Sequence, residues 1–167
     1  MSYPAKAVAN EFLDIAENSG GSLSAMKLQK LVYFAHGWHL ALMNQPLLQE
    51  NVQAWQFGPV VPELYQAFKR FGSKAVTEPA REMTLRNHKI VFHAPRIADF
   101  EDDDSNVCAL DVVRKVWDTY GKYGAVKLSN ATHMVGTPWY QVYREGQRHK
   151  VIPNELIKEY FKSMIPG

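Results

Sequence analysis

Residues 24–43, SAMKLQKLVYFAHGWHLALM, decide the fold. One stripe at helical spacing comprises Leu28, Leu31, Val32, Ala35, His39 and Leu42. Bulky apolar residues fill most of the remaining circumference, and no formally charged side chain follows Lys30 until Glu50. A helix that is apolar nearly all round is buried on several sides. The pattern therefore predicts a long buried helix through the centre of the domain, with Ser22 or Ser24 as its N-cap.

The flanking segments predict further helices and a small β element. Helices are expected at 4–18, from Pro62 to near Gly72, from 104 or 105 to Gly121, at 125–133, from Thr137-Pro138, and from Pro153 onwards. Residues 52–57 alternate in polarity like a strand, which Gly58-Pro59 ends. Residues 85–92 favour a strand that returns beside residues 52–57. We therefore expect one domain over residues 1–167, an α+β fold dominated by helices, with a two- or three-stranded β element.

Composition and charge limit the classes of function. The net charge of +2 is too small to indicate a nucleic-acid partner. Basic residues nonetheless gather between Lys69 and Arg96, either as solvated loops or as a surface for an acidic partner, and residues 101–104 are all acidic. The single Cys108 excludes a disulfide framework and a metal site built mainly from thiolates. Because no signal peptide or long apolar stretch is present, we expect a cytoplasmic protein without a membrane partner.

Two histidines on the central helix are candidates for metal binding. His36 and His39 lie one turn apart, which suits a shared ion. No acidic or cysteine side chain on the apolar part of that helix completes a ligand set, so we expect neither a metal nor a cofactor. His39 belongs to the apolar stripe, and its ring is expected to be neutral and bonded to a backbone carbonyl.

Residues 129–139 hold the other candidate for chemistry. His133 could act as a general base, but no serine or cysteine lies in a recognisable nucleophile setting. The same residues suit a scaffold in which Thr132 bonds its own backbone, His133 fixes the loop and Trp139 stacks beneath it. We therefore expect a binding protein and not an enzyme. Two alternatives stay open: a hydrolase that uses His133, and a DNA-binding autoregulator with a basic face.

Three motifs resemble a known family. Residues 27–40 read KLQKLVYFAHGWHL, residues 54–65 read AWQFGPVVPELY, and residues 128–133 read LSNATH, with Pro138-Trp139 shortly after. Together they resemble the SocA-like antitoxin family, also called the Panacea domain, which includes phage GepA-like proteins. The resemblance spans roughly residues 5–163, and nothing is carried over onto residues 72–105.

The resemblance implies a mostly helical protein from bacterial and phage toxin–antitoxin pairs. It implies a cognate protein toxin as the partner, neutralised by direct contact, and a cytosolic protease as a second partner if the chain acts as an adaptor. Aromatic and basic side chains are good interface anchors when they are exposed. We expect partner contacts from Tyr33, Gly58, Pro59, Glu63, Tyr65, Lys69 and Arg70. Structural roles are expected for Trp38, His39, Trp55, Thr132, His133 and Trp139.

Overall fold

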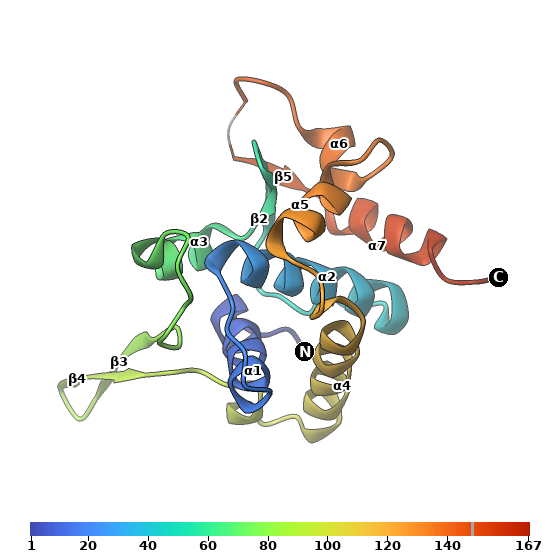
Figure 1. Cartoon of the computed structure of the whole chain (residues 1–167). Helices are drawn as coiled ribbons and strands as arrows, with labels where there is room; N and C mark the ends of the chain where they lie inside the picture. Colours follow the sequence, from blue (N-terminus) through green and yellow to red (C-terminus); the bar gives the residue numbers. More distant parts are fainter. Residues whose placement is uncertain (148) are drawn as a thin grey trace.

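One long helix, α2 (Ala25–Met43), runs through the centre of the computed structural model, which describes residues 1–147 and 149–167 (Figure 1). The helices that pack around it are α1 (Ala5–Asn18), α3 (Pro62–Phe68), α4 (Asp103–Tyr120), α5 (Ala125–His133) and α7 (Asn154–Ser163). Thirteen of the nineteen α2 residues are buried, which confirms the predicted central helix. Leu42 is an exception to the predicted stripe, because it lies in the last turn and is 52% exposed.

A glycine in α2 lets α7 approach closely. The ring of Phe161, which is fully buried, lies directly over Gly37, and a Cβ at that position would overlap the ring. Tyr33, Phe34 and Trp38 pack edge-on around the same Phe161 ring. The aromatic side chains of the central helix are therefore mainly core material.

The first β element is a three-stranded antiparallel sheet in the order β2-β1-β5. Its strands are β1 (Val52–Trp55), β2 (Gly58–Val60) and β5 (Lys150–Ile152). Gln53 of β1 lies opposite Val60 on one side and Val151 on the other. The prediction that Gly58-Pro59 only ends a strand is wrong, because these two residues begin β2 after a two-residue turn.

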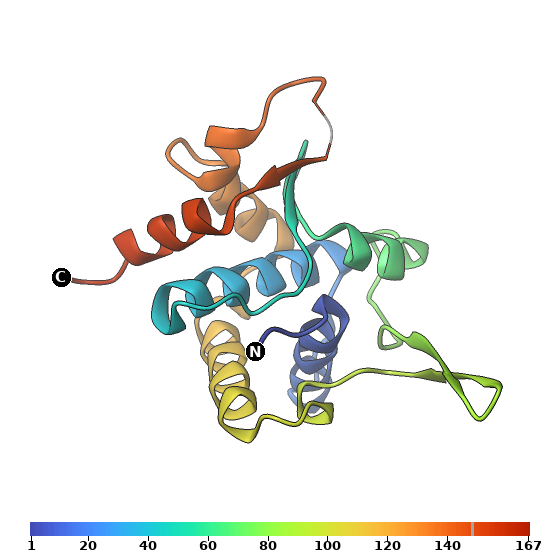
Figure 2. The same ribbon diagram turned by 180° about the vertical axis from the view of Figure 1, so that it is seen from behind.

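The second β element is a separate hairpin. It consists of β3 (Glu82–Arg86) and β4 (Lys89–His93), joined by Asn87 and His88, both with positive φ. Two positive φ values suit the tight turns whose twist matches a hairpin. The predicted pairing of residues 85–92 with residues 52–57 is wrong, because both edges of β1 are already taken by β2 and β5. In Figures 1 and 2 the hairpin projects from the body of the molecule.

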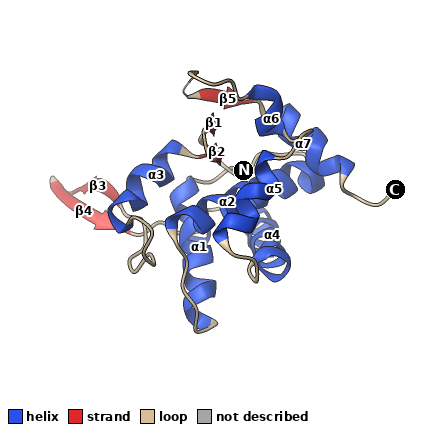
Figure 3. Ribbon diagram, turned by 45° about the horizontal axis from the view of Figure 1, so that its top comes forward, coloured by secondary structure: helices blue, strands red, loops and turns tan. Residues whose placement is uncertain are grey.

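Short helices complete the fold (Figure 3), and polar side chains cap three of the α-helices. Ser24 caps α2, and Thr137 caps α6 (Pro138–Val142). The cap of α4 is Asp102, which accepts from the Ser105 amide, so this helix begins at Asp103, before the predicted start at 104 or 105. Short 3-10 helices lie at Lys69–Phe71 and Ile97–Asp99. Within the part of the chain that the structure describes, no helix has both the length and the apolar character that crossing a bilayer requires.

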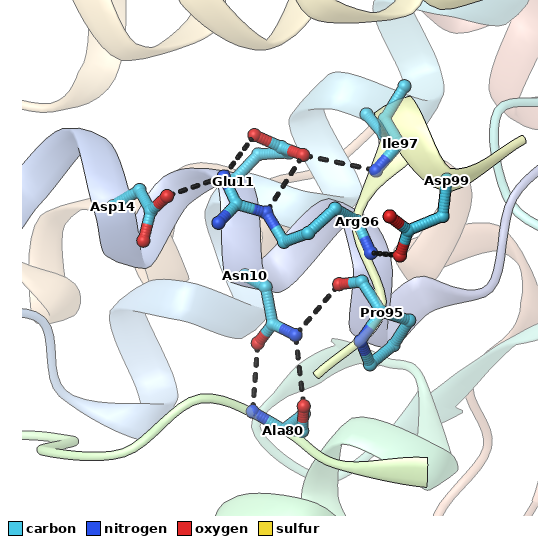
Figure 4. Close-up of polar contacts among 8 residues, drawn as sticks. All are labelled: Asn10, Glu11, Asp14, Ala80, Pro95, Arg96, Ile97 and Asp99. Carbon is cyan, nitrogen blue, oxygen red and sulfur yellow. Dashed lines mark hydrogen bonds and ion pairs between the residues drawn. The ribbon is translucent and has the colours of Figure 1, made fainter. Parts of the chain in front are cut away.

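Polar side chains of α1 fasten both ends of the segment that carries the hairpin (Figure 4). Asn10, 1% exposed, accepts from the Ala80 amide at 2.8 Å and donates to the carbonyls of Ala80 and Pro95. Glu11 accepts two hydrogen bonds from the Arg96 guanidinium. We call Asn10, Glu11 and Arg96 the α1 clamp. It joins two points fifteen residues apart in sequence, Ala80 and Pro95, to one helix.

Loss of the Asn10 amide tests the clamp. Asn10→Ala leaves three buried backbone groups without their partner, and each such group costs about 1–3 kcal/mol. We expect the free energy of unfolding, measured in urea, to fall by at least about 2 kcal/mol. The matched control is Asn18→Ala at the exposed end of the same helix, which should change it by less than about 0.5 kcal/mol. Equal effects of the two substitutions would contradict this account of the clamp.

Candidate functional site

A buried lysine joins α2 to the β1–β2 turn. Lys30 is 2% exposed, and its Nζ donates to the carbonyls of Phe57 at 3.2 Å and Pro59 at 3.0 Å. Among the described residues, no carboxylate lies within ion-pair distance of this amine. Burial lowers the pKa of Lys30 to about 8, because the ammonium group is removed from water. The amine is thus a directional link between helix and turn, held by carbonyl oxygens alone.

Gly58 makes this link possible. Its φ is +117°, which a side chain rarely tolerates. A Cβ at Gly58 would lie 2.8 Å from Lys30 Nζ, 2.9 Å from Thr132 Oγ1 and 3.1 Å from His133 Cε1. The turn therefore needs glycine for its backbone conformation and for the space that three side chains occupy.

Helix α5 holds the same turn from the other side. Ser129 Oγ donates to the Phe57 carbonyl at 3.1 Å. Thr132 Oγ1 and His133 Nδ1 both donate to the Ser129 carbonyl. His133 also packs against the Trp139 ring, with 4.5 Å between ring centroids, and Trp139 Nε1 donates to the carbonyl of Trp55. The three sequence motifs thus meet at one place, the backbone of residues 55–59.

The two histidines of α2 bond to different parts of the chain. His39 Nδ1 donates to the Gln45 carbonyl at 2.7 Å, as predicted, and burial lowers its pKa. His36 Nδ1 accepts from the Leu48 amide, so its Nε2 carries the hydrogen that bonds Asn154. Burial lowers the pKa of His36 to about 4. Outside residue 148, the structure contains no cluster of three or more metal-ligating side chains.

A groove of about 950 Å³ opens beside the turn. Lys30 and Gln29 lie at its base, and Gln29 bonds both the amide and the carbonyl of Val61. Its aromatic wall includes the Trp55–Tyr65 pair, whose ring centroids are 5.0 Å apart. The exposed side chains of the lining include Met26, Phe57, Tyr65, Lys69 and His149.

The predicted contact residues divide into three groups. Tyr65 and Lys69 line the groove. Glu63 and Arg70 are exposed but lie outside its lining, and Arg70 pairs with Glu78 at 2.8 Å. The third group, Tyr33, Gly58 and Pro59, is buried.

Three predicted contacts need correction. Tyr33 is 3% exposed and packs between Phe34 and Phe161, so its side chain is part of the core. Gly58 and Pro59 are buried under the turn and serve it through their backbone. In this fold none of the three presents a surface to a partner.

Trp38 and Trp55, for which structural roles are expected, are partly buried, and the indole N–H of each donates a hydrogen bond. Trp38 Nε1 donates to the Tyr120 hydroxyl at 3.0 Å, and Trp55 Nε1 donates to Gln53 at 2.9 Å. Lys30 and Gln29 are site residues that sequence reasoning missed. Two adjacent polar residues inside an otherwise apolar helix were the available signal, because such residues must find buried partners.

The space around Gly58 gives a direct test. Gly58→Ala adds backbone strain and three short contacts, so we expect a loss of at least about 2 kcal/mol in the free energy of unfolding. Gly136→Ala is the control, because Gly136 has φ +89° but nothing within 4 Å of an added Cβ. The control should lower the free energy of unfolding by about 1 kcal/mol, from backbone strain alone. Denaturation curves in which Gly58→Ala is no worse than Gly136→Ala would refute the close approach.

The burial of Lys30 predicts a dependence of stability on pH. Its folded pKa is about 8, whereas the ordinary value is 10.5. Below pH 8 both states hold the proton, and the folded state bears the full burial cost. Between pH 8 and 10.5 only the unfolded state holds it, so stability rises with pH. Relative to Lys30→Met, the free energy of unfolding of the native chain should rise by up to about 1.4 kcal/mol per pH unit over this window.

Unfolding in urea at several values between pH 7.5 and 9.5 measures this difference. The other titrating groups are shared by the two proteins and cancel in the comparison. Parallel stability curves for the native chain and Lys30→Met would show that the lysine does not lose its proton in the folded state.

Comparisons with known proteins agree with the motifs that meet at the turn. The antitoxin SocA-like, Panacea domain family matches residues 28–140, which include most of the central helix, the turn and α5. The chain is 34% identical over 140 residues to Antitoxin SocA of Caulobacter vibrioides (strain NA1000 / CB15N), covering 83% of this chain and 70% of that protein. No solved structure matches the chain significantly. The chain therefore belongs to the antitoxin SocA-like, Panacea domain family.

Proposed function

We propose that this protein is an antitoxin that binds a cognate protein toxin and neutralises it by direct contact, without catalysis. One observation carries the proposal: a chain 34% identical to an antitoxin has an aromatic groove of about 950 Å³ directly over the family's motifs. The groove supplies a contact surface, and the buried links beneath it keep that surface in one shape.

The groove has the composition of a protein-binding surface. Phe57 is 65% exposed and Tyr65 is 45% exposed, so both have apolar area to bury against a partner. Lys69 adds a positive charge beside them. Aromatic anchors with a basic neighbour are typical of the few residues that dominate the energy of an interface.

The hydrolase alternative has less support. Ser129, Thr132 and His133 donate to backbone carbonyls, so the hydroxyls near the histidine are engaged in holding the turn. A pocket shared by His133, His39 and Glu63 would support a hydrolase, but none of these three residues lines the groove.

The DNA-binding alternative also has less support. Two of the basic side chains between Lys69 and Arg96 are paired with carboxylates. Arg70 pairs with Glu78, and Arg96 pairs with Glu11. Such pairing reduces the positive charge available to phosphates.

Neutralisation can proceed by blocking the toxin or by delivering it to a protease as an adaptor. The two routes differ in one measurable quantity, the lifetime of the toxin in the cell. A blocked toxin accumulates in the complex, whereas a delivered toxin disappears faster when this protein is present.

Co-expression with the product of the neighbouring gene tests the proposal. We expect growth rescue by the native chain and its co-purification with that product. Tyr65→Ala should weaken binding in a titration calorimeter at least tenfold, about 1.4 kcal/mol, because it removes a groove anchor. Tyr140→Ala, which truncates a tyrosine of similar exposure outside the groove lining, is the control and should bind like the native chain.

The unfolding midpoints of both variants establish that they remain folded. Absence of rescue and of co-purification by the native chain would overturn the proposed function. Equal affinities of the two tyrosine variants would instead remove the groove from the interface.

A further inference from the structure

The β3–β4 hairpin has one apolar face and one polar face. Its register places Met83 opposite Phe92 and Leu85 opposite Ile90. Side chains of directly paired residues lie on the same side of a two-stranded sheet, and the side alternates along each strand. These four residues therefore share one face, which we call the apolar face. The intervening pairs, Glu82–His93, Thr84–Val91 and Arg86–Lys89, form the opposite face.

The apolar face is uncovered. Its four side chains are exposed by 65% for Met83, 71% for Leu85, 63% for Ile90 and 65% for Phe92. The hairpin stands away from the helices on the side of the molecule where α3 lies (Figures 1 and 3). A contiguous exposed apolar surface on a folded protein marks an interaction site.

The hairpin is positively charged. Residues 81–93 contain Arg81, Arg86 and Lys89 against the single acidic Glu82, a difference of three minus one, or +2. None of these side chains forms an ion pair within the part of the chain that the structure describes. The positive charge at the turn end is thus available to an outside partner.

The base of the hairpin is fixed. The α1 clamp holds Ala80 before β3 and Pro95 after β4. Glu11 also accepts from the Ile97 amide at 3.1 Å, which extends the attachment beyond Pro95. A surface whose attachment is preorganised loses less conformational entropy on binding.

We infer that the hairpin is a toxin-recognition arm. Its apolar face packs on an apolar patch of the partner protein, and carboxylates at the rim of that patch receive Arg86 and Lys89. This inference rests on the proposed function and adds a second contact surface to the groove. Charge favours this occupant over a symmetric pairing of two arms, because both arms would carry the same positive charge, whereas an acidic-rimmed protein surface complements it.

Paired variants on the two faces test the inference. Leu85→Ser/Ile90→Ser alters a cross-strand pair on the apolar face, and Thr84→Ser/Val91→Ser alters the adjacent pair on the opposite face. Each is titrated calorimetrically with the purified product of the neighbouring gene. We expect at least a tenfold weaker affinity for the first and less than a threefold change for the second. Arg86→Gln/Lys89→Gln should reduce the dependence of affinity on salt concentration.

Each outcome separates the arm from the proposed function. If the native chain does not bind the neighbouring product, the proposed function fails and the inference with it. If the native chain binds and Leu85→Ser/Ile90→Ser binds equally well, the arm is not the recognition element while the proposed function stands. Unchanged salt dependence in Arg86→Gln/Lys89→Gln would contradict the acidic rim.

Two further measurements exclude other occupants. Light scattering that shows a dimer of the native chain, converted to a monomer by Leu85→Ser/Ile90→Ser, would assign the apolar face to a second copy. Co-sedimentation with vesicles of phosphatidylglycerol and phosphatidylcholine, lost in the same variant, would assign it to a membrane. Either result would overturn the inference. A monomeric protein that stays in the supernatant when the vesicles sediment supports it.

Discussion

The ammonium group of Lys30, enclosed between the carbonyls of Phe57 and Pro59, is the constraint on which the site depends. A buried cation without a carboxylate must be surrounded by oxygen dipoles, and the chain provides them by curving its backbone around the amine. The curve forces Gly58 into a conformation that needs a residue without Cβ. The Phe57 carbonyl also accepts from Ser129, so α2 and α5 fix the same peptide from two sides. With its backbone fixed inside, the Phe57 side chain points outwards.

A second type of contact, made by buried carboxamide side chains, attaches surface segments to helices. A carboxamide carries a donor and an acceptor side by side, as a peptide group does. Gln29 of α2 bonds both the amide and the carbonyl of Val61, after β2, and Asn10 of α1 does the same with Ala80, before β3. Both side chains are buried, where each hydrogen bond is costly to lose. The groove and the hairpin thus begin next to residues held by the helical core.

Local patterns in the sequence were sufficient for the helices, but long-range pairing was not readable from them. The central helix, α5 and the helix after Pro153 follow from apolar spacing and from glycine, proline and serine at their ends. Pairing of β1 with β5 joins residues almost a hundred positions apart, which no local pattern encodes. Tyr33 was expected at a partner surface as an aromatic anchor, but its helix is apolar nearly all round, and the packing of Phe161 from α7 encloses its ring. Lys30 was visible as a charge in an apolar helix, but its partners come from residues 57–59.

Hydrogen bonds from buried polar side chains fix the positions of the groove and the hairpin, and this matters for recognition of a partner. Apolar packing is not directional, and the burial of the Lys30 ammonium group opposes folding below pH 8. Hydrogen bonds to named carbonyls, in contrast, fix the position and orientation of a turn within a few tenths of an ångström. The groove is lined by residues of 25–72 and 143–147 and by His149, and the hairpin is a separate segment that spans Glu82–Arg86 and Lys89–His93. If one partner is to contact both, their relative position must be set before binding, and the directional links to α1 and α2 are the contacts that set it.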